Sequence, residues 1–145
     1  MDYMMLNRQG PDLLTVLNRV RTGLTIPHVK RIARCALSAL EHCHARGIIH
    51  CDLKPENLMY PVGGYDPDRP SDVVLIDFGS VRYTGCTDRV GSLGYIAPEV
   101  ILYQPKTTAC DIWSLGVVLF SARMSIGLFL DFDRVEDYLD RKSVV

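Results

Sequence analysis

Residues 109–122 restrict the possible folds more than any other stretch, because they are apolar on nearly every side of a helix. A helix with this pattern has no solvent-facing side, so other elements must cover it all round. We predict a helix from Ala109 to Ala122, capped by Thr107 or Thr108, at the centre of a mainly helical domain. Its apolar side chains are those of Ile112, Trp113, Leu115, Val117, Val118, Leu119 and Phe120.

Two stretches nearer the N-terminus have apolar residues at helical spacing on one face only. Pro11 and Asp12 begin a short helix, where the acid is favoured by the helix dipole. Thr25 caps a longer helix with Pro27 in its first turn, and Gly47 follows its end. The two apolar faces consist of Leu13, Leu14, Leu17 and Val20 in the first helix, and of Val29, Ile32, Ala33, Ala36, Leu37, Leu40 and Cys43 in the second.

The stretch 48–59, IIHCDLKPENLM, carries an acid, a base and an amide between apolar pairs. Alternation can turn Asp52 and Lys54 to the same side, while Pro55 fixes the backbone between them. Such a loop offers a carboxylate to accept a hydroxyl proton and an ammonium to neutralise phosphate. Asn57 adds an amide oxygen for a hard metal ion.

This stretch resembles the catalytic loop of eukaryotic protein kinases, H-R-D-L-x-x-x-N. Three later motifs fit the same family in the same order: Asp77-Phe78-Gly79 after a strand, Ala97-Pro98-Glu99, and Asp111-Ile112-Trp113-Ser114-Leu115-Gly116. About a dozen specified residues, each at roughly one in twenty by composition, make coincidence negligible. The resemblance implies an α+β, mainly α fold, a fragment of the kinase C-lobe with a short β-hairpin at the catalytic cleft.

By this resemblance the chain is a serine/threonine protein kinase that transfers the γ-phosphate of ATP to protein hydroxyls. Asp52 would orient the hydroxyl and accept its proton, and Lys54 would screen the transferring phosphoryl group. Asn57 and Asp77 would hold Mg²⁺. ATP would contact Lys54, Asn57 and Asp77, with the backbone of Asp2 and Met4 at the adenine edge.

The resemblance also assigns substrate-binding and structural residues. Glu56 and Ser92 would contact the protein substrate, and the Ser92 hydroxyl would bond both Asp52 and Lys54, which points to serine or threonine as acceptor. Gly79 would permit the turn after Phe78. The structural residues would be His50, Phe78, Gly79, Glu99, Asp111 and Trp113. We treat 1–145 as a partial kinase catalytic domain, in which 1–124 match the family and 125–145 form a divergent tail with a helix around 134–141.

Composition sets limits on compartment and partners. The net charge of −1 gives no electrostatic case for nucleic acid or membrane binding. Five cysteines without zinc-type pairing are best interpreted as small apolar residues in a reducing compartment. With no signal peptide or membrane span in the sequence, we expect an intracellular protein, cytoplasmic or nuclear. Three residues, His42-Cys43-His44, point different ways on a helix, so we expect a solvated face and no metal there.

Several departures from the family pattern lower the expected activity. The glycine-rich loop and strand lysine of the upper lobe do not precede the hinge, so activity should fall by several orders of magnitude. Cys51 replaces the usual arginine, which makes phosphorylation at Thr84 or Thr87 a weaker switch, with Arg82 or Arg89 as partial substitutes. Glu99 lacks its usual arginine partner. The apolar helix would remain partly uncovered unless the tail, a missing N-lobe or another partner covers it. The alternatives are a non-catalytic regulatory or peptide-binding module and an incomplete gene product.

Overall fold

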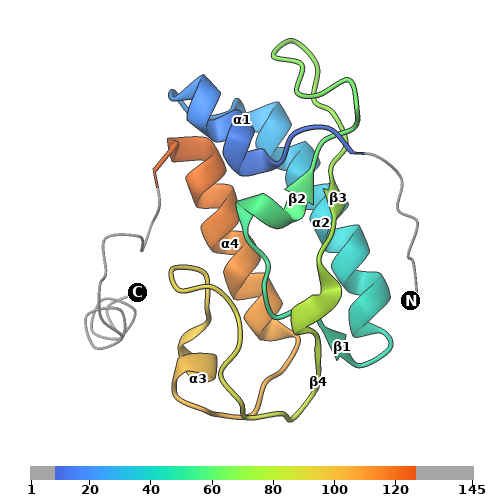
Figure 1. Cartoon of the computed structure of the whole chain (residues 1–145), viewed down its shortest axis with the longest axis vertical. Coiled ribbons are helices and arrows are strands. Elements are labelled where there is room, and N and C mark those ends of the chain that lie inside the picture. The colour runs from blue at the N-terminus through green and yellow to red at the C-terminus, as the bar shows by residue number, and fades with distance from the viewer. Residues whose placement is uncertain (1–8, 127–145) are drawn as a thin grey trace, which may run out of the picture.

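The computed structural model describes residues 9–126, so the expectations for Asp2, Met4 and the helix around 134–141 fall outside the described residues. The predicted mainly helical architecture with short antiparallel strands is confirmed (Figure 1). Within 9–126, no helix is both long enough and apolar enough to span a membrane. The elements are helices α1 (Leu13–Val20), α2 (Ile26–His44), α3 (Pro98–Ile101) and α4 (Ala109–Met124), strands β1 (Ile48–Ile49), β2 (Leu58–Met59), β3 (Val74–Leu75) and β4 (Arg82–Tyr83), and 3₁₀ turns η1 (Pro55–Asn57) and η2 (Phe78–Ser80).

The apolar helix α4 packs along α2, and the two run side by side in Figure 1. Its inner face is buried as predicted, with Val118 and Ala122 fully enclosed. One strip remains uncovered within the described chain: Ile112 is 47% exposed, and Gly116 and Arg123 follow it on the same face. The expected incomplete coverage of α4 is therefore confined to one side of the helix.

The strands form two separate antiparallel pairs. β2 pairs with β3, Leu58 opposite Leu75, and this pair agrees with the short β-hairpin that the family resemblance implies. β1 pairs with β4, Ile48 opposite Tyr83, which the sequence analysis did not anticipate. Since β1 leads into the stretch 50–57 and β4 follows Asp77-Phe78-Gly79, this second pair ties the two candidate site segments together.

The segment before α1 is bonded to the end of β2. Gly10 N donates to Tyr60 O at 2.8 Å and Tyr60 N donates to Pro11 O at 2.9 Å. Asp12 also forms an isolated antiparallel bridge with Met59. These bonds fix the start of α1 beside the strand that follows Asn57.

The helix caps agree with the sequence only in part. Asp12 caps α1 as expected, since its carboxylate accepts from Thr15 N at 2.7 Å. Thr25 occupies the N-cap position of α2, but its hydroxyl bonds the His28 ring at 2.7 Å instead of the helix backbone. At α4, Thr107 Oγ1 accepts from Ala109 N at 3.3 Å. His28 is buried, which explains why the Thr25 hydroxyl is taken up by the ring.

We predict that Leu40→Ala lowers the free energy of unfolding by about 2–5 kcal/mol, because the truncation leaves a cavity where α2 meets the core. Leu40 is 1% exposed. Leu37, on the same helix but 46% exposed, is the matched control, and its alanine variant should stay within about 0.5 kcal/mol of the parent. Urea unfolding followed by circular dichroism measures both, and equal losses would contradict the packing described.

Candidate active site

The carboxylate of Asp111 on α4 holds the loop that follows β1. Its Oδ2 accepts from His50 N at 2.8 Å, and its Oδ1 accepts from Cys51 N at 2.9 Å. His44 Nε2 lies 2.8 Å from Oδ2. Because Asp111 is fully buried, these bonds replace the hydration that its charge loses. Through these bonds Asp111 joins α4 to the backbone of the loop that follows β1.

His44 has a different environment from the one predicted. Its position on the helix predicted a solvated face, but its side chain is only 15% exposed and contacts Asp111. It lies at the last position of α2, where that helix packs on α4. The expectation was wrong because helical periodicity of α2 alone does not show which residues meet a second helix far along the chain.

His50 connects the same loop to the segment that carries Asp77. Its Nδ1 accepts from Asp52 N at 3.3 Å, which leaves Nε2 to donate to Ile76 O at 3.0 Å. The ring also meets the Phe78 ring edge to face, with centroids 5.0 Å apart. Ile76 N donates to Asn57 O at 2.9 Å. The backbone N–H and C=O groups of Ile76, the residue before Asp77, are therefore both bonded to the loop 50–57.

Asp52, Lys54 and Ser92 form a closed triangle of polar contacts. Ser92 Oγ donates to Asp52 Oδ1 at 2.7 Å, and Lys54 Nζ donates to Ser92 Oγ at 2.8 Å. Lys54 Nζ also lies 3.1 Å from Asp52 Oδ2. Both ionic side chains are partly exposed, so a ligand can reach them. This arrangement sets a carboxylate and an ammonium side by side at the surface, with a hydroxyl between them.

Asn57 and Asp77 supply oxygen donors next to this triangle. Asn57 Nδ2 donates to Asp52 O at 2.8 Å, which leaves the amide oxygen of the buried side chain available. Asp77 has a left-handed backbone, φ 62°, and its carboxylate is exposed, with Oδ1 accepting from Gly79 N at 3.2 Å. One amide oxygen and one carboxylate fit Mg²⁺, which keeps water and phosphate oxygens as its other ligands. Residues 9–126 contain no cluster of three or more His, Cys, Asp or Glu side chains that would form an all-protein metal cage.

The turn after Asp77 differs from the sequence-based expectation. The left-handed residue is Asp77, and Gly79 does not have a positive φ. An added Cβ at Gly79 would lie 3.2 Å from Asp77 Oδ1. A side chain at position 79 would therefore be close only to the Asp77 carboxylate.

The other predicted site residues lie around this centre. Glu56 is exposed in η1, and Trp113 is half-buried on α4. Glu99 begins α3 and makes no ion pair within the described chain. Phe78 is 46% exposed even though it contacts His50.

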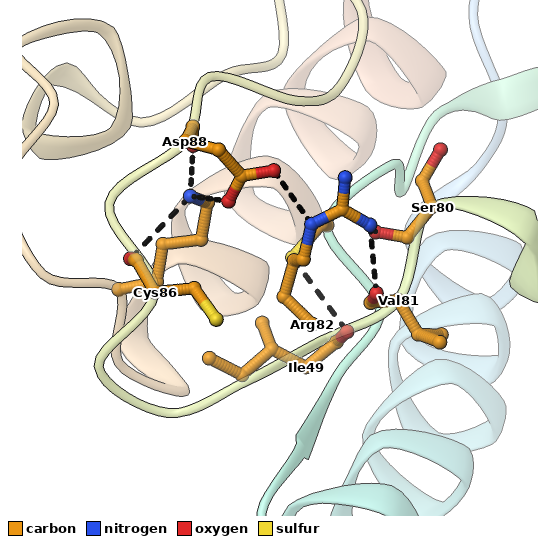
Figure 2. Close-up of polar contacts among 8 residues, drawn as sticks. Ile49, Ser80, Val81, Arg82, Cys86 and Asp88 are labelled. Carbon is orange, nitrogen blue, oxygen red and sulfur yellow. Dashed lines mark hydrogen bonds and ion pairs between the residues drawn. The ribbon is translucent and has the colours of Figure 1, made fainter.

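A second polar cluster fixes the segment after β4. The sequence did not predict it. Asp88 Oδ2 accepts from Arg82 Nε at 2.6 Å, and Asp88 Oδ1 accepts from Lys106 Nζ at 2.9 Å. Figure 2 shows Asp88 facing Arg82, whose guanidinium also donates to the carbonyls of Ser80 and Val81. Lys106 is fully buried and also donates to the carbonyls of Cys86 and Asp88. The hydrogen bonds from Lys106 and Arg82 lower the pKa of Asp88.

This cluster corrects one expectation. Arg82 was proposed as a partial substitute for the arginine that Cys51 replaces, as a partner for phosphate. Its guanidinium is instead engaged by Asp88 and two carbonyls. The carboxylate of Asp88 therefore already binds the guanidinium of Arg82. A buried lysine far along the chain gives no periodic signal in the sequence, and for this reason the cluster was not predicted.

A carboxylate, an ammonium and an amide on one loop are groups of the kind that phosphoryl transfer uses, and here they lie in a mainly helical fold. The comparisons agree: the protein kinase domain family matches residues 1–141. The chain belongs to the protein kinase domain family.

Its relatives include protein kinases from several animals. The cGMP-dependent protein kinase, isozyme 1, of Drosophila melanogaster is 38% identical over 122 residues, covering 81% of this chain and 15% of the relative. Serine/threonine-protein kinase H1 of Homo sapiens is 38% identical over 114 residues, 74% of this chain and 26% of the relative. Calcium/calmodulin-dependent protein kinase type 1 of Macrobrachium nipponense is 38% identical over 96 residues, 61% of this chain and 26% of the relative. The matched part is thus about a quarter or less of these relatives' length.

We predict that Gly91→Ala destabilises the chain more than Gly85→Ala. Both glycines have positive φ, 110° and 96°, so both variants carry a backbone cost of about 1–3 kcal/mol. A Cβ at Gly91 would lie 2.5 Å from Cys51 O, whereas nothing lies within 4 Å of one at Gly85. The clash should add roughly 1–3 kcal/mol and displace the neighbouring Ser92 from Asp52. Thermal unfolding of both variants measures the difference, and equal midpoints would argue against this contact.

We predict that Asp88→Asn lowers stability at neutral pH and that adding Lys106→Met restores part of it. The single variant leaves a buried ammonium without its carboxylate, whereas the double variant has no buried ammonium in this cluster. Chemical unfolding at pH 7 compares the two, and a double variant no more stable than the single one would contradict this account.

The same carboxylate predicts an acid-dependent loss of stability. The pKa of Asp88 is lowered in the folded chain, so its stabilising contribution is present above the unfolded value of about 3.9 and is lost as the pH falls through the folded pKa. Asp88→Asn should therefore reduce the loss of stability between about pH 5 and pH 2. Unfolding curves across this range provide the measurement, and an unchanged pH profile would contradict it.

Proposed function

We propose that this chain carries the phosphoryl-transfer half of a serine/threonine protein kinase, acting on protein hydroxyls with ATP and Mg²⁺. The observation that supports this most is the triangle of Asp52, Lys54 and Ser92, built beside the oxygen donors of Asn57 and Asp77. The family match and the names of the relatives support the same reaction.

In this proposal the chain's own residues position charges and a proton. Asp52 has a carboxylate that already accepts one hydroxyl hydrogen, from Ser92, and its remaining lone pairs would orient the substrate hydroxyl and accept its proton. Lys54, 3.1 Å away, would balance the negative charge that spreads over the transferring group. His50 and Asp111 act through the backbone, because their bonds fix the loop from which Asp52 projects.

Asn57 and Asp77 are the residues proposed to hold Mg²⁺. The ion supplies charge neutralisation of the phosphate oxygens when bound. Asn57 offers the amide oxygen that its bond to Asp52 O leaves available, and Asp77 offers an exposed carboxylate. The adenine contacts of Asp2 and Met4, and the substrate contact of Glu56, stay predictions from the family resemblance.

The preference for serine or threonine acceptors rests on Lys54 and Ser92. Their 2.8 Å contact places an ammonium and a hydroxyl next to Asp52, where a short acceptor side chain would enter. An intracellular location is also proposed, and the five free cysteines are consistent with a reducing compartment.

A non-catalytic, peptide-binding role is the second candidate. The observation in its favour is Cys51, which stands where the family resemblance implies an arginine. A chain with the docking face alone would bind peptide without nucleotide. The two roles therefore differ in their response to ATP with Mg²⁺.

We predict that Asp52→Asn lowers phosphate transfer to a serine peptide by about 10²–10⁴-fold while nucleotide-dependent thermal stabilisation persists. Asp77→Asn should instead lose the stabilisation that ATP gives only with Mg²⁺ present. Radiolabel transfer and thermal unfolding measure the two effects. Peptide binding with neither transfer nor Mg²⁺-dependent stabilisation would favour the binding role and overturn the enzymatic one.

A further inference from the structure

Two cysteines lie together between the candidate catalytic loop and the central helix. Cys51 immediately precedes Asp52, and Cys110 immediately precedes Asp111. Both thiols line one small cavity, enclosed with Val90, Ile96, Ala97, Val100 and Ser114. Cys51 is half-buried and Cys110 is buried. The pair therefore has one partner that a small solute can approach and one that only Cys51 and its neighbours contact.

The backbone keeps these two positions adjacent. Asp111 Oδ1 accepts from Cys51 N at 2.9 Å, so the peptide of Cys51 is fixed against the first turn of α4, which carries Cys110. Each of the two thiols is the largest single influence on the pKa of the other, and the Cys51 sulfur lies 3.6 Å from Ile49 O. Both thiols are free in the structure and line the same small cavity, so they are placed to approach the roughly 2 Å of a disulfide bond.

We propose that Cys51 and Cys110 are a peroxide-sensitive thiol pair, which forms a reversible disulfide between the catalytic loop and α4. Cys51 is the attacking sulfur and Cys110 is the resolving one.

The environment of the two sulfurs favours this order. The neighbouring Cys110 thiol lowers the pKa of Cys51, and the charges of Lys106 and Arg82 act in the same direction, against burial and the charge of Asp111. The contact with Cys51 and burial raise the pKa of Cys110. The thiolate is the reacting form, so Cys51 reacts first.

The chemistry balances with one peroxide. The Cys51 thiolate attacks a peroxide oxygen, the O–O bond breaks, and the departing hydroxide takes a proton to give water and a sulfenic acid. The Cys110 sulfur then attacks the Cys51 sulfur, the S–O bond breaks, and the hydroxide leaves with the thiol proton as a second water. Two thiols lose two electrons in total and one peroxide gains them. A thiol reductant reverses the second product to two thiols.

The other cysteines have different neighbours. Cys35 donates to Asp72 at 3.3 Å, and burial together with Asp72 raises its pKa. Cys43 lies on α2, with its pKa raised by burial and by Asp111. These two residues serve as controls, since no second thiol influences the pKa of either one.

A bond at this place would act on the candidate catalytic residue. Cys51 has a left-handed backbone, φ 67°, and the next residue is Asp52. Formation of the disulfide would change the backbone conformation at Cys51 and so the position of Asp52. The effect on phosphate transfer rests on the proposed function, whereas formation of the disulfide does not depend on it.

The experiment treats the full chain with increasing hydrogen peroxide, blocks remaining thiols with an alkylating reagent and maps disulfide-linked peptides by mass spectrometry. We expect a Cys51–Cys110 linked peptide within one chain, a mass lower by two hydrogens, and recovery of both thiols with dithiothreitol. Cys35→Ser and Cys43→Ser should keep this product, whereas Cys51→Ser should lose it. In Cys110→Ala the Cys51 sulfenic acid should instead persist, trapped by dimedone.

The results separate this proposal from the proposed function. Linkage of Cys51 to Cys86 or between chains, or oxidation of Cys35 and Cys43 before Cys51, would overturn the thiol pair. Disulfide formation in a chain that transfers no phosphate would leave the pair standing and count only against the kinase reaction. If transfer is present, peroxide should inhibit it in the parent and dithiothreitol should restore it. In Cys110→Ala, excess peroxide should oxidise the unresolved Cys51 sulfenic acid to the sulfinic acid, from which dithiothreitol does not restore transfer.

Discussion

The site depends on one buried carboxylate, that of Asp111. A charge at that depth is stable only while its partners are in place, and here they are two backbone N–H groups and the His44 ring. The N–H groups belong to His50 and Cys51, directly before Asp52. The requirement to satisfy Asp111 therefore fixes the backbone directly before Asp52, so the position of the proposed proton acceptor depends on the buried carboxylate of Asp111.

Backbone groups, more than side chains, connect this loop to the segment that carries Asp77. His50 bonds the C=O group of Ile76 and Asn57 bonds its N–H group, and Asp77 is the next residue. The short pairs β1–β4 and β2–β3 then flank the loop on both sides. Because peptide groups are the same in every residue, the geometry tolerates sequence change between the motifs while the oxygen donors stay in place.

The sequence was sufficient to predict α1, α2 and α4 and the pairing of β2 with β3, because their signals are local. It also predicted the contacts of Ser92 with Asp52 and Lys54, through a family resemblance that was specific at these positions. It could not predict the pair β1–β4, the contact of His44 with Asp111, or Lys106 beneath Asp88. Each of these joins residues far apart in the chain, and neither periodicity nor composition encodes which distant group will satisfy a buried charge. The roles assigned to the site residues stay predictions.

The bonded start of α1 has a mechanical consequence. Gly10 and Pro11 share hydrogen bonds with Tyr60, and Asp12 bridges Met59, so the beginning of α1 and the end of β2 are joined through their backbones. Asn57 precedes that strand by one residue. A tilt of α1 would therefore be transmitted along a few peptide units of the backbone to the amide proposed for the metal.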